Sequence, residues 1–453
     1  MKTYKLHLTI LAFIICVTAP TMLLAQTPMT LHDCMVYALD NSLKVKMQEL
    51  TTDDARLARR DAILNAFTPG IDAGASAQMS FGRTIDPETN TYVTTATFSN
   101  NYSVSGGIYI FNGFSAVNNI RISKTSLSMG ADREKLAENE LCLATMQAYY
   151  NVVYYQKLVT ILEDQIETAN SALTLAVRQE ELGQKGYADV VEMEAELASR
   201  EYQLVNARNM YNDALITLKD LMFWPMDQEL VIDVSMADKD FVSILTPENE
   251  TDGIVEYARE NMPSIAIARK NMLVAGYDLK TAKWRFAPSL YLSGGWSTGY
   301  YTYPGQEGYV PLPFWNQLTN NQGEWVGVSL SFPIYNRLGN LSNLRRKRNA
   351  YTRASLEYQQ KQRDVESEVR RAVQDRDGAA AAFRQAERRA TVQEESYHLS
   401  LKQYEQGLIS ALEFQTASDN WLNAKSVKLD ALLKYYIKCS VVNYYNGIDY
   451  IEQ

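Results

Sequence analysis

The sequence predicts an internally duplicated α+β membrane protein that combines very long helices with four strands suited to crossing a bilayer. Three observations support this fold class. The two halves of the chain run through the same order of helical and strand-like patterns, which indicates a repeated unit. Two segments of about 70 residues contain no proline and very little glycine. Four shorter segments alternate apolar with small polar residues, which is typical of strands.

Four short motifs recur in the second half at nearly constant separations of 220, 219, 224 and 224 residues. The paired motifs are Tyr37–Asn41 with Tyr257–Asn261, Phe67–Pro69 with Phe286–Pro288, Ile110–Asn112 with Ile334–Asn336, and Glu180–Gly183 with Tyr404–Gly407. We therefore expect one structural repeat over residues 26–223 and a second over 251–446. A linker over 224–250 would join them, and a short C-terminal tail would follow over 447–453.

The N-terminus has the layout of a cleavable secretory signal over residues 1–25. Lys2 and Lys5 precede an apolar run, and the small residue Ala25 ends it. A transmembrane anchor is the alternative, although Pro20 interrupts the run. No later segment has the ~20 consecutive apolar residues of a spanning helix. An exported chain of this kind is therefore either soluble or crosses a membrane as strands.

The composition argues against a nucleic-acid partner and against catalysis. Without the signal, 42 basic residues face 53 acidic ones, a net charge of −11, so the basic face that nucleic acid requires is missing. Cys34, Cys142 and Cys439 remain, and their odd number and spacing fit neither a disulfide framework nor a zinc site. His32 and His398 have no metal-ligand neighbours in the sequence. We expect no cofactor, no metal and no enzyme activity.

Two long helices are predicted over 113–183 and 338–407, because each segment keeps an apolar stripe at spacings of three and four residues. Gly183 and Gly407 end them, since glycine accepts the left-handed backbone that stops a helix. Tight helical hairpins should follow, with returning helices over 187–223 and 411–445. Shorter helices are expected before the strands of each repeat, over 31–39, 43–66, 254–260 and 264–286.

Strand hairpins are predicted over 70–111 and 289–335. Ile71 and Ala73 alternate with Asp72 and Gly74 in the first hairpin, and the same pattern continues through the second. Alternation indicates a sheet with one apolar and one wet face. Strands of about 10 to 12 residues cross a bilayer when tilted, and small polar residues suit a water-filled lumen. The alternative is a soluble sheet covered by a helix, although its solvent face would normally carry charges.

The loops of these hairpins are expected over 83–97 and 301–323. Aromatic residues in the second loop fit either an interfacial girdle or a self-packed loop. Four strands cannot close a barrel alone, and an open sheet edge in lipid leaves backbone groups unpaired at several kcal/mol each. If the strands span a membrane, several chains must therefore share one barrel.

This duplicated order of elements resembles the TolC family of outer-membrane efflux proteins over about residues 26–446. The resemblance implies a homotrimer in which each chain gives four strands to a twelve-stranded transmembrane β-barrel. A long α-helical coiled-coil tunnel would continue the barrel into the periplasm. Pro69, Pro288 and Pro333 match the helix–strand swivels of the family, whereas Tyr109 stands at the fourth such position.

The resemblance further implies an outer-membrane location in a Gram-negative bacterium and contact with outer-membrane lipids. The function it implies is that of a passive exit duct for efflux or type I secretion. Its partners would be a periplasmic adaptor (membrane fusion) protein, docking at the hairpin tips near Gly183 and Gly407, and an inner-membrane RND or ABC transporter. The energy would come from that transporter, since the sequence has no Gly-x-x-x-x-Gly-Lys nucleotide-binding loop.

A periplasmic gate at the hairpin tips is also implied by the resemblance. Asp189 and Tyr404 match the positions of a locking contact between neighbouring hairpins. Considered without the family, Asp189 fits a helix N-cap and Tyr404 fits a packing residue.

Two further positions belong to the constriction ring of this implied gate. Glu413 matches the first acidic position of the ring, whereas Thr416 occupies the second in place of aspartate. Ile409 stands where a locking arginine can occur. Without the family, Glu413 fits a solvated helix face.

The basic run Arg345–Arg348 follows the last strand, where it fits contact with anionic lipid headgroups or a solvated helix turn. Two other functions were weighed. One is a soluble periplasmic coiled-coil scaffold without a pore. The other is a hydrolase of envelope polymers, which requires a paired-carboxylate or serine–histidine constellation that we do not find.

Overall fold

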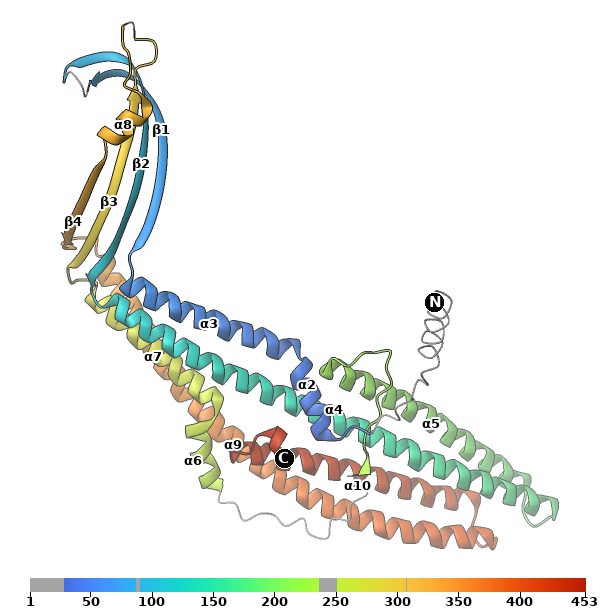
Figure 1. The fold of residues 1–453 in the computed structure, drawn as a ribbon. Helices are drawn as coiled ribbons and strands as arrows, with labels where there is room; N and C mark the ends of the chain where they lie inside the picture. Colours follow the sequence, from blue (N-terminus) through green and yellow to red (C-terminus); the bar gives the residue numbers. More distant parts are fainter. Residues whose placement is uncertain (1–27, 87–89, 236–250, 307) are drawn as a thin grey trace, which may run out of the picture.

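The computed structural model describes residues 28–86, 90–235, 251–306 and 308–453. The expected signal over 1–25 lies outside these residues, as does the second part of the expected linker, 236–250. The described chain forms a curved four-stranded sheet at one end and a long helical assembly that extends from it (Figure 1).

Both halves contain two helices, two strands, a very long helix and a returning helix in the same order, and the second half adds a short helix between its strands and a 3-10 turn at its end. The first half comprises α2 (Leu31–Asn41), α3 (Leu43–Phe67), β1 (Gly70–Ile85), β2 (Tyr92–Asn112), α4 (Ser115–Glu181) and α5 (Tyr187–Met222). The second comprises α6 (Thr251–Asn261), α7 (Pro263–Trp284), β3 (Ser289–Thr302), α8 (Phe314–Asn320), β4 (Gly323–Ser331), α9 (Gly339–Glu405), α10 (Ala411–Tyr445) and the 3-10 turn η2 (Tyr450–Glu452). Helices α4 and α9 each have 67 residues, or about 100 Å at 1.5 Å per residue.

The strands form one antiparallel sheet in the order β1-β2-β3-β4. They differ in length from the predicted 10 to 12 residues: β1 has 16, β2 has 21, β3 has 14 and β4 has nine. The prediction of a loop over 83–97 was wrong. Arg83 pairs with Thr94 and Ile85 with Tyr92, because β-branched and aromatic residues on both sides continue the ladder.

The helix–strand junctions differ between the two repeats. Pro69 and Pro288 precede β1 and β3, and Pro333 follows β4. The end of β2 has no proline, and its register with β3 shifts between Tyr109 and Phe111, as in a β-bulge. A bulge bends its strand, so this junction turns by a different device from the proline of the second repeat.

The main core lies where α2, α4, α5 and α10 meet. It buries Cys34, Met146, Val153, Leu218 and Leu433, together with other apolar residues. Parts of the linker and of the C-terminal tail pack here as well. Ile232 of the linker is 3% exposed and forms a parallel bridge with Met29. Tyr450 of the C-terminal tail is also 3% exposed. The start of the linker and the C-terminal tail therefore both pack into the main core.

The cysteines form no disulfide in the described part of the chain. Burial raises the pKa of Cys34 and of Cys142 to about 12, and it also raises the pKa of the half-buried Cys439. His32 and His398 are both exposed helix residues. Nδ1 of His32 lies 3.1 Å from the carbonyl oxygen of Ile451.

Candidate functional site

The sheet has one apolar and one small-polar face, as the alternation predicts. Register pairing places Val104 between Ala73 and Trp296 on the apolar face. On the other face, Ser103 lies between Gly74 and Ser297. The apolar face is not covered in the single chain: the exposed side chains there include Ile71, Phe81, Val326, Val328 and Leu330. An uncovered apolar face of this size indicates a binding surface for lipid or protein.

The edges of the sheet are also open. In the described part of the chain, β1 pairs only with β2, and β4 pairs only with β3. Each outer edge presents a row of backbone donors and acceptors, which is a template for a strand of another chain.

Among the residues with assigned coordinates, no helix is both long enough and apolar enough to span a bilayer.

The hairpin tips have the same backbone geometry in both repeats. Gly183 has φ of 69° and Gly407 has φ of 72°, in the left-handed region. The amide of Gln184 donates to the carbonyl of Gln179, and the amide of Leu408 donates to that of Gln403. These six-to-one bonds, with the accompanying bonds from the glycine amides, define a Schellman motif. The glycines therefore end α4 and α9 as predicted.

An aromatic column fills the region next to the tips. Tyr404 is completely buried and stacks on Phe414 at 5.1 Å between ring centroids, and Tyr397 stacks on Trp421 at 4.4 Å. The ammonium of Lys185, in the α4–α5 turn, lies 3.8 Å from the centroid of the Tyr404 ring. This cation–π contact joins the first hairpin to the second. Tyr404 therefore has a packing role within one chain.

Two polar groups of this column lack hydrogen-bond partners in the described part of the chain. Neither the hydroxyl of Tyr404 nor the ammonium of Lys185 has a hydrogen-bond partner within the described residues. Burial raises the pKa of Tyr404 to about 12, and the charges of Asp189 and Glu192 act in the same direction. Burial lowers the pKa of Lys185, while the carboxylate of Asp189 opposes that shift. Buried polar atoms without partners cost free energy, so the tip carries a local energetic penalty that the described part of its own chain does not relieve.

Asp189 is half-buried in the first turn of α5. It is not the N-cap, because Gly186 occupies that position without a side-chain bond, so the N-cap interpretation was wrong. As the third residue of the helix, its carboxylate still lies at the positive end of the helix dipole. No hydrogen bond joins Asp189 to Tyr404 within the part of the chain described here.

Glu413 and Thr416 are both exposed on the first turns of α10. Glu413 closes a capping box with Ser410: the Ser410 amide donates to Oε2 at 2.9 Å, and the Glu413 amide donates to Oγ at 3.2 Å. The Ser410 amide and the Ser410 hydroxyl both donate to the carboxylate of Glu413 and lower its pKa. The hydroxyl of Thr416 donates to the carbonyl of Leu412. Ile409 is half-buried in the α9–α10 turn.

A buried ionic cluster, which the sequence analysis missed, lies further up the hairpins. Arg200 of α5 is 1% exposed and pairs with Glu196, at 2.7 Å, and with Asp419 of α10. Its guanidinium also donates to Ser418, whose hydroxyl donates to Gln165 of α4 at 3.0 Å. The cluster thus links three helices from both hairpins. The sequence signal for this cluster is the position of Arg200, seven residues after the buried Met193 and seven before the buried Ala207. That spacing places the arginine at a core position of the heptad.

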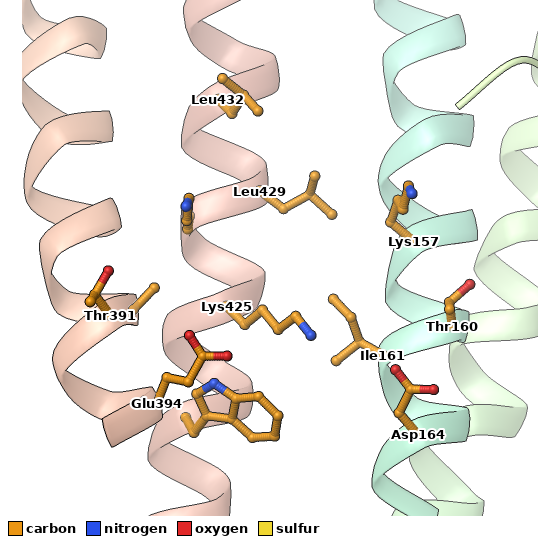
Figure 2. A pocket seen from close by; sticks show the side chains of 12 residues that line it. Lys157, Thr160, Ile161, Asp164, Thr391, Glu394, Lys425, Leu429 and Leu432 are labelled. Atoms are coloured by element: carbon orange, nitrogen blue, oxygen red, sulfur yellow. The ribbon is translucent and has the colours of Figure 1, made fainter. Parts of the chain in front are cut away.

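A groove of about 340 Å³ runs between α4 and α10 near this cluster (Figure 2). Figure 2 shows Lys425 and Leu429 of α10 directed toward Ile161 of α4. Carboxylates of Asp164 and Glu394 also line the groove. Because both signs of charge are present, the groove does not select an anion or a cation.

Comparison with solved structures identifies the fold. The fold matches CusC, from a study of folding and transmembrane channel formation, with a TM-score of 0.77 over 92% of both chains at 15% identity. It matches the outer-membrane channel OprN with a TM-score of 0.76 over 93% of this chain and 90% of that one, at 17% identity. The outer membrane protein VceC of Vibrio cholerae gives 0.74 over 92% and 96%, at 15% identity. The chain therefore has the fold of these outer-membrane proteins.

Sequence comparison gives the family. The outer membrane efflux protein family matches residues 35–222 and 254–439, once in each half of the chain. Since these segments cover most of the sequence, the chain belongs to the outer membrane efflux protein family. The alkaline protease secretion protein AprF of Pseudomonas aeruginosa is 23% identical over 308 residues, which are 65% of this chain and 61% of that protein. The match thus spans about three fifths of the length of this relative.

Proposed function

We propose that three copies of this chain form a homotrimeric outer-membrane exit duct, with their twelve strands closed into one β-barrel. The observation that carries this proposal is the combination of an exposed apolar sheet face with two unpaired sheet edges. In lipid the face would be solvated by acyl chains, and closure would pair every edge. Strand β1 has 16 residues, or about 53 Å, which exceeds the ~30 Å hydrocarbon layer even when the strand is tilted.

The helices would continue this barrel as a periplasmic tunnel, with Pro69, Pro288 and Pro333 turning the chain between strand and helix. The tunnel would work passively, with a periplasmic adaptor docking near Gly183 and Gly407 and an inner-membrane RND or ABC transporter supplying the energy. The family includes efflux proteins and resembles a protein named for protease secretion. The proposal therefore covers both efflux and type I protein secretion.

At the tip, Asp189 and Tyr404 would lock neighbouring hairpins, and Glu413 and Thr416 would line the constriction. The contact between Lys185 and the Tyr404 ring, which joins the first hairpin to the second beside Asp189, supports a role of these residues at the tip.

Assembly is tested by the mass and membrane behaviour of the mature chain. Light scattering in detergent should give three copies per particle, and the protein should stay in the membrane pellet after carbonate washing. A monodisperse monomer in buffer without detergent would instead support the soluble coiled-coil scaffold, and it would refute the exit duct.

The gate is tested in planar bilayers. Asp189→Ala combined with Tyr404→Phe should raise single-channel conductance, because the lock between hairpins is removed. The matched control is Asp213→Ala with Tyr202→Phe, which changes the same residue types on α5 away from the tip. Equal conductance of the gate variant and the control would leave Asp189 and Tyr404 as structural residues.

A further inference from the structure

A basic surface lies where the helices join the sheet, although the mature chain as a whole is acidic. Residues 325–356 contain six basic and no acidic residues, and residues 279–306 contain three basic and no acidic residues. We call six of these side chains the basic collar: Lys280, Lys283, Arg285, Arg345, Arg346 and Arg348. They lie at the C-terminal end of α7 and the N-terminal end of α9, directly below the sheet (Figure 1).

Two contacts fix the collar residues at a common height. Lys347 of α9 forms an ion pair with Asp278 of α7, and Nδ2 of Asn340 donates to the carbonyl of Arg285 at 3.3 Å. Since α7 runs toward the sheet and α9 runs away from it, these contacts align 278–285 with 340–347. The six basic side chains therefore occupy one narrow band.

The charges of the collar are not neutralised by the protein. All six side chains are exposed. Within the described ranges, none of them forms an ion pair with a carboxylate, and the carboxylate of Asp278 in α7 is paired with Lys347. Lys280 lies 5.3 Å from the centroid of the Tyr277 ring, which leaves its charge in place.

The collar stands at the height of a membrane interface if the sheet spans the bilayer. Trp284, Phe286 and Tyr335 are 48%, 49% and 78% exposed at the helix–sheet junction, and exposed aromatic side chains of this kind mark the boundary of the hydrocarbon layer. Arg345 lies six residues into α9, about 9 Å from its start. The headgroup region is roughly 5–8 Å deep on each side of a bilayer, so the arginine side chains reach it.

The collar presents positive charge on both faces of the layer that α7 and α9 form side by side. Successive residues on a helix differ by about 100° in direction. Lys347 points along the layer toward α7, as its ion pair shows. Arg346 and Arg348 therefore point to opposite faces of the layer. Whichever face meets lipid, one of these arginines is directed toward it.

We propose that the basic collar binds anionic glycerophospholipid headgroups in the periplasmic leaflet of the outer membrane. This proposal rests on the proposed insertion of the sheet. Arginine forms paired hydrogen bonds with phosphate oxygens, and a basic surface beside a bilayer concentrates anionic lipid in a salt-dependent manner. The headgroups would hold the helix–sheet junction at a fixed depth.

Trp284 supplies an internal reporter, because it lies between Lys283 and Arg285. The protein is reconstituted in phosphatidylcholine vesicles containing a fixed fraction of brominated phosphatidylglycerol or brominated phosphatidylcholine. The quenching of Trp284 is taken as the difference from a Trp284→Phe variant. Quenching by the anionic lipid should exceed that by the zwitterionic lipid at least threefold or so, and the ratio should fall toward one at 1 M salt.

The test variant changes Arg345, Arg346 and Arg348 to Gln, and its anionic-lipid preference should fall at least about twofold. The matched control changes Arg384, Arg388 and Arg389 to Gln, three exposed arginines on the same helix far from the sheet, and should keep the preference. Equal quenching by both lipids, or an equal loss in both variants, overturns the collar proposal.

Channel measurements on the same vesicles separate the two proposals. A protein that conducts but shows no anionic-lipid preference refutes lipid binding and leaves the exit duct intact. A reversal potential that shifts in the collar variant while lipid preference is unchanged assigns these arginines to the pore wall, and it also refutes lipid binding. Failure to insert as a trimer overturns the exit duct, and the collar proposal with it.

Discussion

Replacing Arg200 by methionine should open the hairpins locally. The substitution leaves the Glu196 carboxylate, whose side chain is 5% exposed, without its partner. Removing one member of a buried ion pair costs about 3–5 kcal/mol, because the remaining charge stays desolvated. Asp419 is 55% exposed at its side chain, so its pair with Arg200 adds little. At ~1.4 kcal/mol per factor of ten, the equilibrium constant for local opening of this region should increase roughly 10²- to 4 × 10³-fold.

Amide hydrogen exchange measures this opening directly, since protection factors report local opening free energies. Peptides of α5 around Arg200 and of α10 around Asp419 should lose protection in the Arg200→Met variant. Peptides from β2 and β3 should not change, because the sheet lies at the opposite end of the molecule (Figure 1).

A double variant supplies the control for this reasoning. Adding Glu196→Leu to Arg200→Met removes the unpaired charge, and apolar residues often replace a buried ion pair without loss of stability. The double variant should therefore regain most of the protection. If it loses more protection than Arg200→Met alone, the cost is not that of a stranded carboxylate, and the reasoning is refuted.

Three further predictions concern the tips and the core. Gly183→Ala should destabilise the first tip by about 1 kcal/mol, because an alanine is strained at φ of 69°, and Gly183→Asn should cost less, as thermal melting would show. Cys34 and Cys142, with pKa values raised to about 12, should resist maleimide at pH 8 and react only after unfolding, which mass spectrometry would detect. The carboxyl group of Glu413 has a lowered pKa in the folded protein. The stabilisation of α10 by its capping box should therefore be complete above about pH 4.3 and should disappear as the pH falls through the folded-state pKa of Glu413. Amide exchange in the first turn of α10, corrected for intrinsic rates, should show this loss at pH 3, and Ser410→Ala should reduce it, because only the backbone donor to the carboxylate remains.

Features that repeat along the chain or depend on neighbouring residues could be predicted from the sequence. The recurrence of short motifs, the spacing of apolar residues and the glycines at positive φ each depend on local chemistry, so Gly183 and Gly407 were predicted at the positions where α4 and α9 end. The alternation along the strands also predicted which side chains share a face of the sheet.

Features that depend on contacts between distant segments were not predictable in the same way. The chain over 83–97 contains turn-forming and β-branched residues together, and only the pairing of Arg83 with Thr94 shows how far the ladder continues. Arg200 resembles a solvated helix residue until Asp419 and Ser418, more than 200 positions away, are placed beside it. Ile232 and Tyr450 lie in segments without periodicity, and their burial follows from the shape of a core assembled by other helices.

The pairing of β2 with β3 joins the hairpins of the two repeats inside one chain through 14 residue pairs. In a closed ring of three chains, the equivalent seam between chains would join β4 to β1, and β4 supplies only nine residues. The ring would thus alternate three long seams with three shorter ones. When the ring is pulled apart or heated, the chains would separate first at the shorter β4–β1 seams. Each chain would then leave with its four-stranded sheet intact.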